Sequence, residues 1–238
     1  NGMGTDVTDL NGDGLLDFVV SDLGPPRLLV SSPGGFIESG PALGFLPENP
    51  VGSWATVGWS VDWADLDNDS WVDLVHASGR EEPEDFGGYP DLVWEQRSDG
   101  TFEDRSSHWG FTSTRDHYGH AVADLNGDGF LDIVTGGIGE PLQLYLNRCD
   151  EASWISVELA GSPGNSWGLG ARVEVEMPDG RRLVRQVQGL RSMGQGPPRA
   201  HFGLGEIEGE VRMTVRWPDD GQVVTYDLAV RTHHRLTR

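Results

Sequence analysis

The chain repeats one acidic segment, which reads Asp9-Leu10-Asn11-Gly12-Asp13-Gly14-Leu15-Leu16-Asp17 in its first copy. The second copy is Asp65-Leu66-Asp67-Asn68-Asp69-Ser70-Trp71-Val72-Asp73, and the third is Asp124-Leu125-Asn126-Gly127-Asp128-Gly129-Phe130-Leu131-Asp132. Successive copies start 56 and 59 residues apart. A repeat of this length is typical of a four-stranded β-propeller blade. The sequence therefore predicts an all-β fold that begins with a partial β-propeller of about three blades.

The flanks of each copy favour strands. Short segments precede the copies at residues 5–8, 61–64 and 120–123, and apolar runs follow them at residues 18–20, 74–75 and 133–134. Strand, acidic loop and strand is the natural interpretation of this pattern. We call the three acidic segments loop 1, loop 2 and loop 3.

Each loop presents side-chain oxygens at its positions 1, 3, 5 and 9, which suits a hard divalent cation. Ca²⁺ takes six to eight oxygen ligands, and a backbone carbonyl at position 7 would add to the side chains, whereas Mg²⁺ demands a stricter octahedron. Soft ligands are absent from the loops, which disfavours zinc and copper. We predict up to three Ca²⁺ ions, with these ligands: Asp9, Asn11, Asp13, Leu15 carbonyl and Asp17; Asp65, Asp67, Asp69, Trp71 carbonyl and Asp73; Asp124, Asn126, Asp128, Phe130 carbonyl and Asp132.

Loop 2 differs from the other two at position 6. Gly14 and Gly129 suit the left-handed turn that closes such a loop, but loop 2 has Ser70 there. Its four carboxylates favour cation binding while its backbone resists the turn, so its affinity is left open. None of the loops is an EF-hand, because position 12 lacks the bidentate Glu and the next segment is strand-like.

The second part of the chain has a different character. Residues 1–150 hold 27 acidic residues and 6 arginines, whereas residues 151–238 hold 11 of each. Acidic loops are absent after residue 150, and alternating apolar residues predict strands at 154–159, 171–177, 182–187, 211–217 and 223–228. We therefore predict a propeller domain over residues 1–150 and a small β-sandwich-like domain over residues 151–238.

Composition excludes some classes of function. The formal net charge is −21, all basic residues are arginine, and no segment has the apolar length of a membrane helix. Nucleic acid is therefore not an expected partner, because phosphate binding needs concentrated positive charge. A single cysteine, Cys149, excludes an internal disulfide.

The three loops and their flanks resemble the FG-GAP or VCBS repeat family, the calcium-binding propeller repeats also found in integrin α-subunit heads. The second part resembles the ASPIC/UnbV domain in four segments: residues 168–175, 189–195, 201–205 and 217–221. The resemblance implies a secreted or cell-surface protein, periplasmic if bacterial, with seven blades in complete members. Since three loops account for about three blades, we expect this chain to be a fragment or one subunit of a larger assembly.

Other residues invite chemical interpretations that the sequence does not decide. His117 and His120, with Asp116, suggest a transition-metal site but are more simply blade residues, and His233-His234 is more simply a solvated pair. Tryptophans in the middle repeat fit blade packing better than a sugar platform. The acidic segment 79–89 is either a partner contact or an insertion.

Three functions follow from these observations. The first is a non-enzymatic, calcium-stabilised module that recognises a protein or carbohydrate ligand at a cell surface or in the matrix. The second is an enzyme similar to polysaccharide lyases, with a base drawn from His108, His117 or Tyr118. The third is a subunit whose missing blades come from upstream sequence or from a partner chain.

Overall fold

The computed structural model contains strands and one turn of 3₁₀ helix, η1 (Pro41–Leu43), in the part of the chain that it describes. The described residues are 2–45, 57–79, 90–147, 151–189, 193–194 and 196–238. The prediction of an all-β protein is confirmed. Within these ranges, no helix is long and apolar enough to cross a membrane. Cys149 and most of the acidic segment 79–89 lie outside the described residues.

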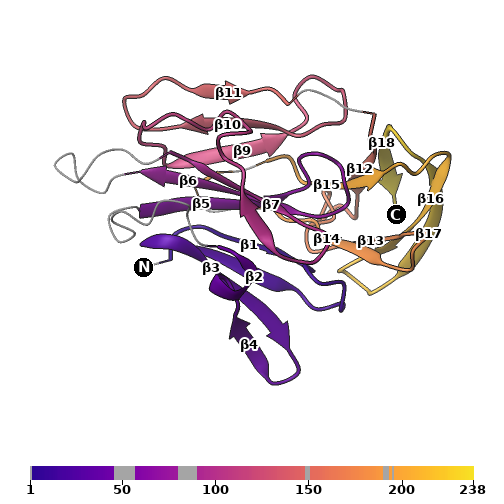
Figure 1. The fold of residues 1–238 in the computed structure, drawn as a ribbon. Helices are drawn as coiled ribbons and strands as arrows, with labels where there is room; N and C mark the ends of the chain where they lie inside the picture. The colour runs from indigo at the N-terminus through magenta and orange to yellow at the C-terminus, as the bar shows by residue number, and fades with distance from the viewer. Residues whose placement is uncertain (1, 46–56, 80–89, 148–150, 190–192, 195) are drawn as a thin grey trace.

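The first part of the chain forms three meandering antiparallel sheets, one for each acidic loop (Figure 1). Sheet 1 contains β1 (Thr5–Thr8), β2 (Asp17–Asp22), β3 (Gly24–Ser32) and β4 (Gly35–Glu38). Sheet 2 contains β5 (Val57–Ala64), β6 (Asp73–Gly79), β7 (Leu92–Gln96) and β8 (Phe102–Asp104). Sheet 3 contains β9 (Gly119–Ala123), β10 (Asp132–Gly136) and β11 (Gln143–Tyr145).

Each acidic loop joins the first two strands of its sheet. The pairs Thr8↔Asp17, Ala64↔Asp73 and Ala123↔Asp132 close the three loops at equivalent positions of the ladder. The first strands β1, β5 and β9 lie next to one another. This arrangement gathers the three loops at one end of the sheets.

Sheet 2 lies between its neighbours and is buried on both faces. Every residue of β6 is buried, including the polar residues Asp73, His76 and Ser78, as expected of a strand that is covered on both faces. One core cluster joins sheets 1 and 2 through side chains such as Val19, Leu28, Trp63 and Trp94. A second cluster joins sheets 2 and 3 through Val75, Val93 and Ile133, among others. Blade-to-blade packing therefore accounts for the buried tryptophans Trp63 and Trp94.

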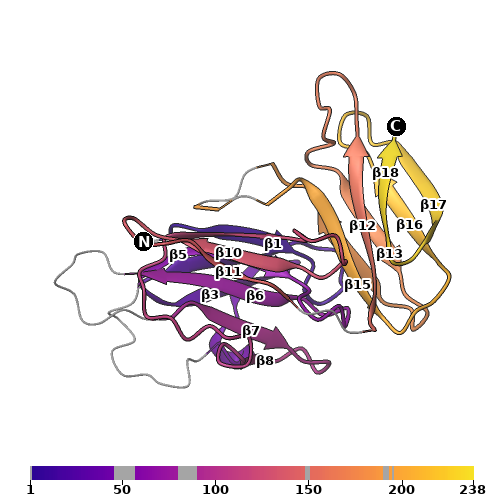
Figure 2. The same ribbon diagram turned by 90° about the horizontal axis from the view of Figure 1, so that it is seen from above.

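The second part of the chain forms two further sheets around a separate core (Figure 2). Sheet 4 has the order β15 (Arg199–Gly205), β12 (Ser153–Ala160), β18 (Thr232–Thr237), in which β12 and β18 are parallel. Sheet 5 has the order β14 (Arg182–Gln186), β13 (Arg172–Glu176), β16 (Glu210–Arg216), β17 (Val223–Ala229). Their shared core contains Ile155, Val173, Phe202 and Trp217.

The described residues thus form five blade-sized sheets, and not the about three blades that the sequence predicted. Counting acidic loops gave the lower number, because sheets 4 and 5 carry no such loop to reveal them. Their strands are also joined out of sequence order, which no repeat period shows. The sequence analysis missed β15 and β18 as strands. The division into domains at residue 150 stays a prediction.

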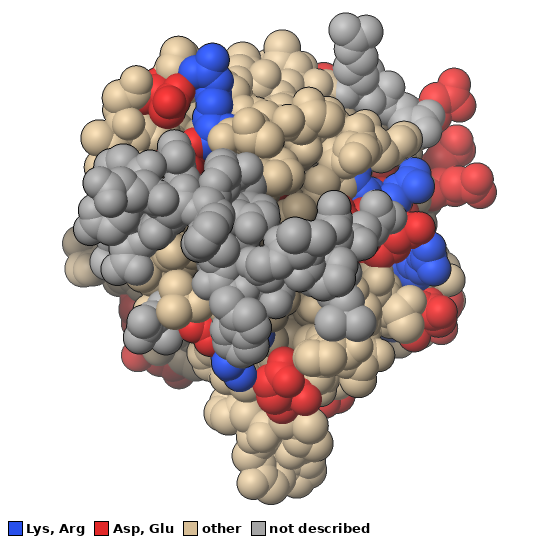
Figure 3. Space-filling model, turned by 60° about the vertical axis from the view of Figure 1, so that its left-hand side comes forward, with Lys and Arg blue, Asp and Glu red and all other residues tan. Residues whose placement is uncertain are grey.

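Charged side chains are unevenly distributed over the surface. On the face shown in Figure 3, acidic and basic side chains form small groups near the margins. The tip of the β3–β4 hairpin projects without charge and carries the exposed side chains of Phe36 and Ile37.

Candidate metal centre

The three acidic loops share one framework of hydrogen bonds from backbone N–H groups to carboxylates. Oδ2 of the position 9 aspartate accepts from the position 2 backbone, with N···O distances of 2.8 Å at Asp17, 2.9 Å at Asp73 and 2.9 Å at Asp132. Oδ1 of the same aspartate accepts a hydrogen bond from a backbone N–H group in, or just after, the third strand of its sheet. The donors are Ser31, Gln96 and Asn147. The position 9 aspartates therefore tie each loop to its own sheet.

Positions 1, 3 and 5 curl the loop around a common point. Oδ2 of Asp9, Asp65 and Asp124 accepts from the position 6 N–H at 2.8, 3.0 and 2.8 Å. The side-chain oxygen of position 3 accepts from the position 5 N–H, and that of position 5 accepts from the position 7 N–H, in all three loops. Since each oxygen has a second acceptor site, this framework leaves acceptor capacity for a cation.

Loop 2 brings three carboxylates together. One oxygen each from Asp65, Asp67 and Asp69 lie within 4.8 Å of one another, and no other such group of acidic, His or Cys side chains occurs in the described part of the chain. Asp73, predicted as a fourth side-chain ligand, is not a member of this group. Loops 1 and 3 have asparagine at position 3, so they offer fewer carboxylates at the same place.

Burial makes this carboxylate group unfavourable without a counter-charge. Asp65 is 2% exposed, and its Oδ1 has no hydrogen-bond partner among the described residues. Burial, followed by repulsion from Asp69 and Asp67, raises the pKa of Asp65 well above its ordinary value. Burial and then the Asp67 charge raise the pKa of Asp69 to about 7. A divalent cation would supply the missing positive charge, so these residues fit a hard metal ion.

Loop 1 also has buried carboxylates without a counter-charge, but less strongly so than loop 2. Oδ1 of Asp9 is buried without a hydrogen-bond partner in the described ranges. Burial is the largest cause that raises the pKa of both Asp9 and Asp17, and the Asp13 charge adds to it. Asn11 and Asp13 are exposed at the open side of the loop. Ligation by the carbonyls of Leu15, Trp71 and Phe130 stays a prediction for all three loops.

Loop 2 adopts the closed shape despite lacking its glycines. Asn68 and Ser70 have φ values of 59° and 78°, close to the 80° and 87° of Gly127 and Gly129 in loop 3. A left-handed conformation is unfavourable for a residue with Cβ, although Asn tolerates it better than most. Contacts with neighbouring segments hold loop 2 closed. Asn68 Nδ2 donates to the Gly129 carbonyl of loop 3 at 3.1 Å, and further contacts come from the C-terminal sheets.

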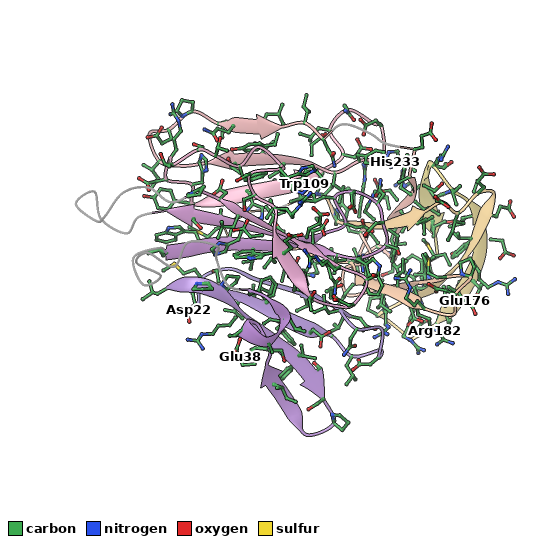
Figure 4. All side chains as sticks on the ribbon, in the orientation of Figure 1. Asp22, Glu38, Trp109, Glu176, Arg182 and His233 are labelled. Carbon is green, nitrogen blue, oxygen red and sulfur yellow. The ribbon has the colours of Figure 1, made fainter. Side chains whose placement is uncertain are left out.

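Side chains and backbone of the C-terminal sheets contact all three loops. Arg172 donates to the Gly14 carbonyl of loop 1 at 2.8 Å. In loop 2, Arg181 donates to Ser70 Oγ at 2.9 Å, and its guanidinium lies 4.4 Å from the Trp71 ring centroid. The third loop meets His233, whose Nε2 is 3.1 Å from Asp124 Oδ2. Figure 4 shows His233 at the boundary between the sheets of the first part and those of the second.

The sequence analysis missed these contacts. His233 is exposed, as expected of a solvated residue, but it also contacts Asp124. The contacts join residues more than a hundred positions apart, so no spacing or periodicity signals them. The one sign in the sequence was the large number of arginines in the second part, which equals its number of acidic residues and suits contact with an acidic surface. A polar cavity of about 80 Å³ lies between the loops and these strands, lined in part by Asp65, Asp124, Arg185 and His201.

The histidines near loop 3 are buried blade residues. His117 Nδ1 is 2.6 Å from Asp91 Oδ2, and His120 Nε2 is 2.8 Å from Asp62 Oδ2. All four side chains are at most 1% exposed. The transition-metal alternative for His117 and His120 therefore finds no open site.

Comparison with known protein families defines the class. A model described as FG-GAP-like repeat matches residues 9–76 and 86–135, and a model described as ASPIC and UnbV matches residues 161–238. The chain carries FG-GAP-like repeats followed by an ASPIC and UnbV domain, as its motifs indicated.

The chain is also similar to individual proteins of known name. Cartilage acidic protein 1 from Homo sapiens is 25% identical over 236 residues, which cover 96% of this chain and 34% of the human protein. The Mus musculus protein of the same name is 25% identical over 240 residues, and the Xenopus tropicalis one is 28% identical over 116 residues. The chain spans about a third of the length of the human and mouse relatives.

Proposed function

We propose that this protein is a calcium-binding module of an extracellular recognition protein, and that it is not an enzyme. The observation that carries the proposal is the carboxylate group of Asp65, Asp67 and Asp69, with oxygens within 4.8 Å of one another and a buried Asp65 Oδ1 that lacks a hydrogen-bond partner in the described chain. Such a group is costly unless a cation occupies it.

Calcium is the ion that this donor set favours. All available donors are hard carboxylate, amide and carbonyl oxygens, and a flexible set of such oxygens suits Ca²⁺ better than Mg²⁺, which demands a near-ideal octahedron. Loops 1 and 3 repeat the framework with one carboxylate fewer, so we propose the strongest site at loop 2. The ions would fix the loops and thereby the surfaces that the sheets present.

The relatives support an extracellular setting. The human, mouse and frog relatives are named cartilage acidic protein 1, and cartilage is an extracellular matrix. We propose that the partner is a protein or a carbohydrate of a cell surface or matrix.

The proposal is tested by the thermal stability of the protein with and without Ca²⁺. A cation that binds the folded state stabilises it in proportion to the logarithm of its concentration above the dissociation constant. We expect the melting temperature of chelated protein to rise by several degrees on Ca²⁺ addition, and less with equal Mg²⁺. An unchanged melting temperature would contradict structural calcium.

A pair of variants locates the ion. Asp69 and Asp99 each accept a hydrogen bond from the backbone N–H two residues later, at 2.7 and 2.9 Å, but only Asp69 belongs to the carboxylate group. Asp69→Ala and Asp99→Ala thus remove the same local bond. We expect Asp69→Ala to lose most of the calcium-induced rise and Asp99→Ala to keep it. Equal rises in the two variants would remove the assignment to loop 2.

No observation favours the lyase-like alternative. His117, one of its three candidate bases, is fully buried against Asp91 and is not presented to a polysaccharide. His108 is exposed, and its ring contacts the ring of Trp109. Among the described residues, no acidic or basic side chain pairs with it.

A further inference from the structure

The contacts between loop 2 and the C-terminal strands are concentrated on the two residues that replace glycine. His201 Nε2 lies 2.8 Å from Asn68 Oδ1, and Gly205 N donates to the Asn68 carbonyl at 2.8 Å. Arg181 donates to Ser70 Oγ at 2.9 Å. Loops 1 and 3 have Gly12 and Gly127 where loop 2 has Asn68. The side chains that make loop 2 unfavourable by itself are therefore the ones that the C-terminal strands hold.

The same strands also contact the carboxylate group directly. Gly203 N donates to Asp65 Oδ2 at 3.1 Å, beside the loop's own donor, Ser70 N, at 3.0 Å. A Cβ atom on Gly203 would lie 2.3 Å from Asp65 Oδ2 and 2.3 Å from the Asn68 Cα. The strand β15 thus approaches loop 2 so closely that no side chain fits between them.

This packing occupies one carboxylate oxygen of the first ligand position, Asp65, and leaves its other oxygen without a hydrogen bond from the described residues. Asp65 Oδ2 is held by two backbone N–H groups, whereas Oδ1 is buried without a hydrogen-bond partner in the ranges that the structure describes. Outer-shell hydrogen bonds of this kind orient metal ligands and commonly change metal affinity 10- to 100-fold when they are removed.

We propose that His201 is a positioning residue for the loop 2 cation site, so that cation affinity at loop 2 depends on contact with the C-terminal strands. The inference rests on the proposed function, since it concerns the affinity of the proposed site. His201 holds Asn68 in its left-handed conformation, and Asn68 fixes the curl that brings Asp67 and Asp69 to Asp65. Cation binding and attachment of the C-terminal strands to loop 2 then favour each other.

Histidine ionisation does not complicate this role near neutral pH. Burial, and next the charge of Arg185, lower the pKa of His201 to about 3. The ring is therefore neutral at pH 7, and a change to alanine removes a hydrogen bond without removing a charge. Arg181 is a poorer probe, because its loss would also remove a positive charge that opposes cation binding.

The test measures Tb³⁺ binding by luminescence sensitised through tryptophan, with Ca²⁺ as the competitor. The Trp71-dependent signal is the part that is lost in Trp71→Phe. Trp71 lies in loop 2 but also lines a pocket with Asp9 and Asn11 of loop 1, so the part of the Trp71-dependent signal that Asp69→Ala removes is taken to report loop 2. Trp154 lies against Gly129 of loop 3, so this subtraction separates the two loops. A wild-type chain without a Trp71-dependent signal displaced by Ca²⁺ would contradict the proposed function itself.

Given that signal, His201→Ala is expected to weaken Ca²⁺ competition at loop 2 about tenfold or more. His201→Gln, which keeps an N–H donor, should restore most of the affinity. The matched control is His234→Ala, because His234 lies on β18 of the same sheet as His201, which is on β15, but has its Nε2 at 2.8 Å from the Ala229 carbonyl oxygen. Equal affinities for His201→Ala and His234→Ala would overturn the inference and leave the proposed function standing.

A double-mutant cycle gives a second route. Asn68→Gly introduces the residue of loops 1 and 3, which adopts the required φ without strain. If His201 acts through Asn68, the double variant loses no more affinity than Asn68→Gly alone. If the loss of affinity in the double variant equalled the product of the two single losses, His201 would act independently of Asn68. That result would also overturn the inference.

Discussion

At the scale of single residues, the buried titratable groups of the sheets respond to pH in a direction that the structure fixes. His76 in β6 is fully buried, with its Nδ1 3.1 Å from Ser78 Oγ. Burial, and next the charge of His120, lower the pKa of His76 to about 3. An unfolded chain binds this proton near pH 6.5, so below that pH the unfolded state gains protons that the folded state does not.

We therefore expect the free energy of unfolding to fall as pH drops from 6.5 toward 3, by about 1.4 kcal/mol per pH unit for this group. Urea denaturation of chelated protein at several pH values measures the slope. The non-titrating His76→Gln should have a shallower slope than wild type, whereas replacement of the exposed His108 by Gln should match wild type. Parallel slopes for all three proteins would contradict this role of His76.

Part of the candidate site could be predicted from the spacing of residues within one loop, and part of it could not. The alternation of Asp and Asn predicted where Asp65, Asp67 and Asp69 would converge, because ligand spacing is local and the loop curls on itself. Nothing in the spacing predicted that both oxygens of Asp73 would be occupied by backbone N–H groups of Leu66 and Gln96. One of those donors comes from the third strand of the sheet, so its position depends on pairing that a loop motif does not contain.

At the scale of elements, equivalent positions in the three loops meet different surroundings. Gly14 and Gly129 both occupy position 6 and have φ values of 88° and 87°. A Cβ on Gly14 would meet the Arg172 Nη2 at 3.6 Å, which is ordinary contact. A Cβ on Gly129 would lie 1.7 Å from Cε2 of Trp154, which no small shift relieves. The loop 3 glycine is required by packing as well as by its backbone.

This difference gives a matched pair of substitutions. Gly14→Ala should cost about 1 kcal/mol, the strain of a left-handed residue with Cβ. Gly129→Ala should cost about 2–4 kcal/mol, because overpacking against Trp154 adds to the same strain. Chemical denaturation of both variants measures the two losses. Equal losses would mean that the C-terminal strands do not press on loop 3 in solution.

Strands that flank an acidic loop could be predicted from the sequence. The strands that were missed pair with partners far away along the chain. The segments before and after loop 1 became β1 and β2, because alternation and loop closure are both local. By contrast, β15 and β18 flank β12 in sheet 4, and β18 pairs with it in parallel from the far end of the chain. Such pairing leaves no short-range pattern, so the number of blades predicted from the acidic loops was too low.

Across the whole molecule, as far as its described residues show, sheet 3 differs from sheets 1 and 2 in having three strands rather than four. Its edge strand β11 and the residues directly before and after it carry exposed apolar side chains: Leu142, Leu144 and Leu146 are 76%, 53% and 55% exposed. An edge strand flanked by exposed apolar side chains is a site for strand addition. We propose that a second copy of this chain pairs there.

The expected outcome is association that increases with protein concentration and that charge on this edge prevents. Leu144→Lys should lower the average mass measured by light scattering toward that of the 25.9 kDa chain. Ile37→Lys is the control, since Ile37 is 59% exposed on β4, an edge strand of a sheet that already has four strands. A protein that remains monomeric at every concentration, or that responds equally to both substitutions, would show that the β11 edge is not the contact.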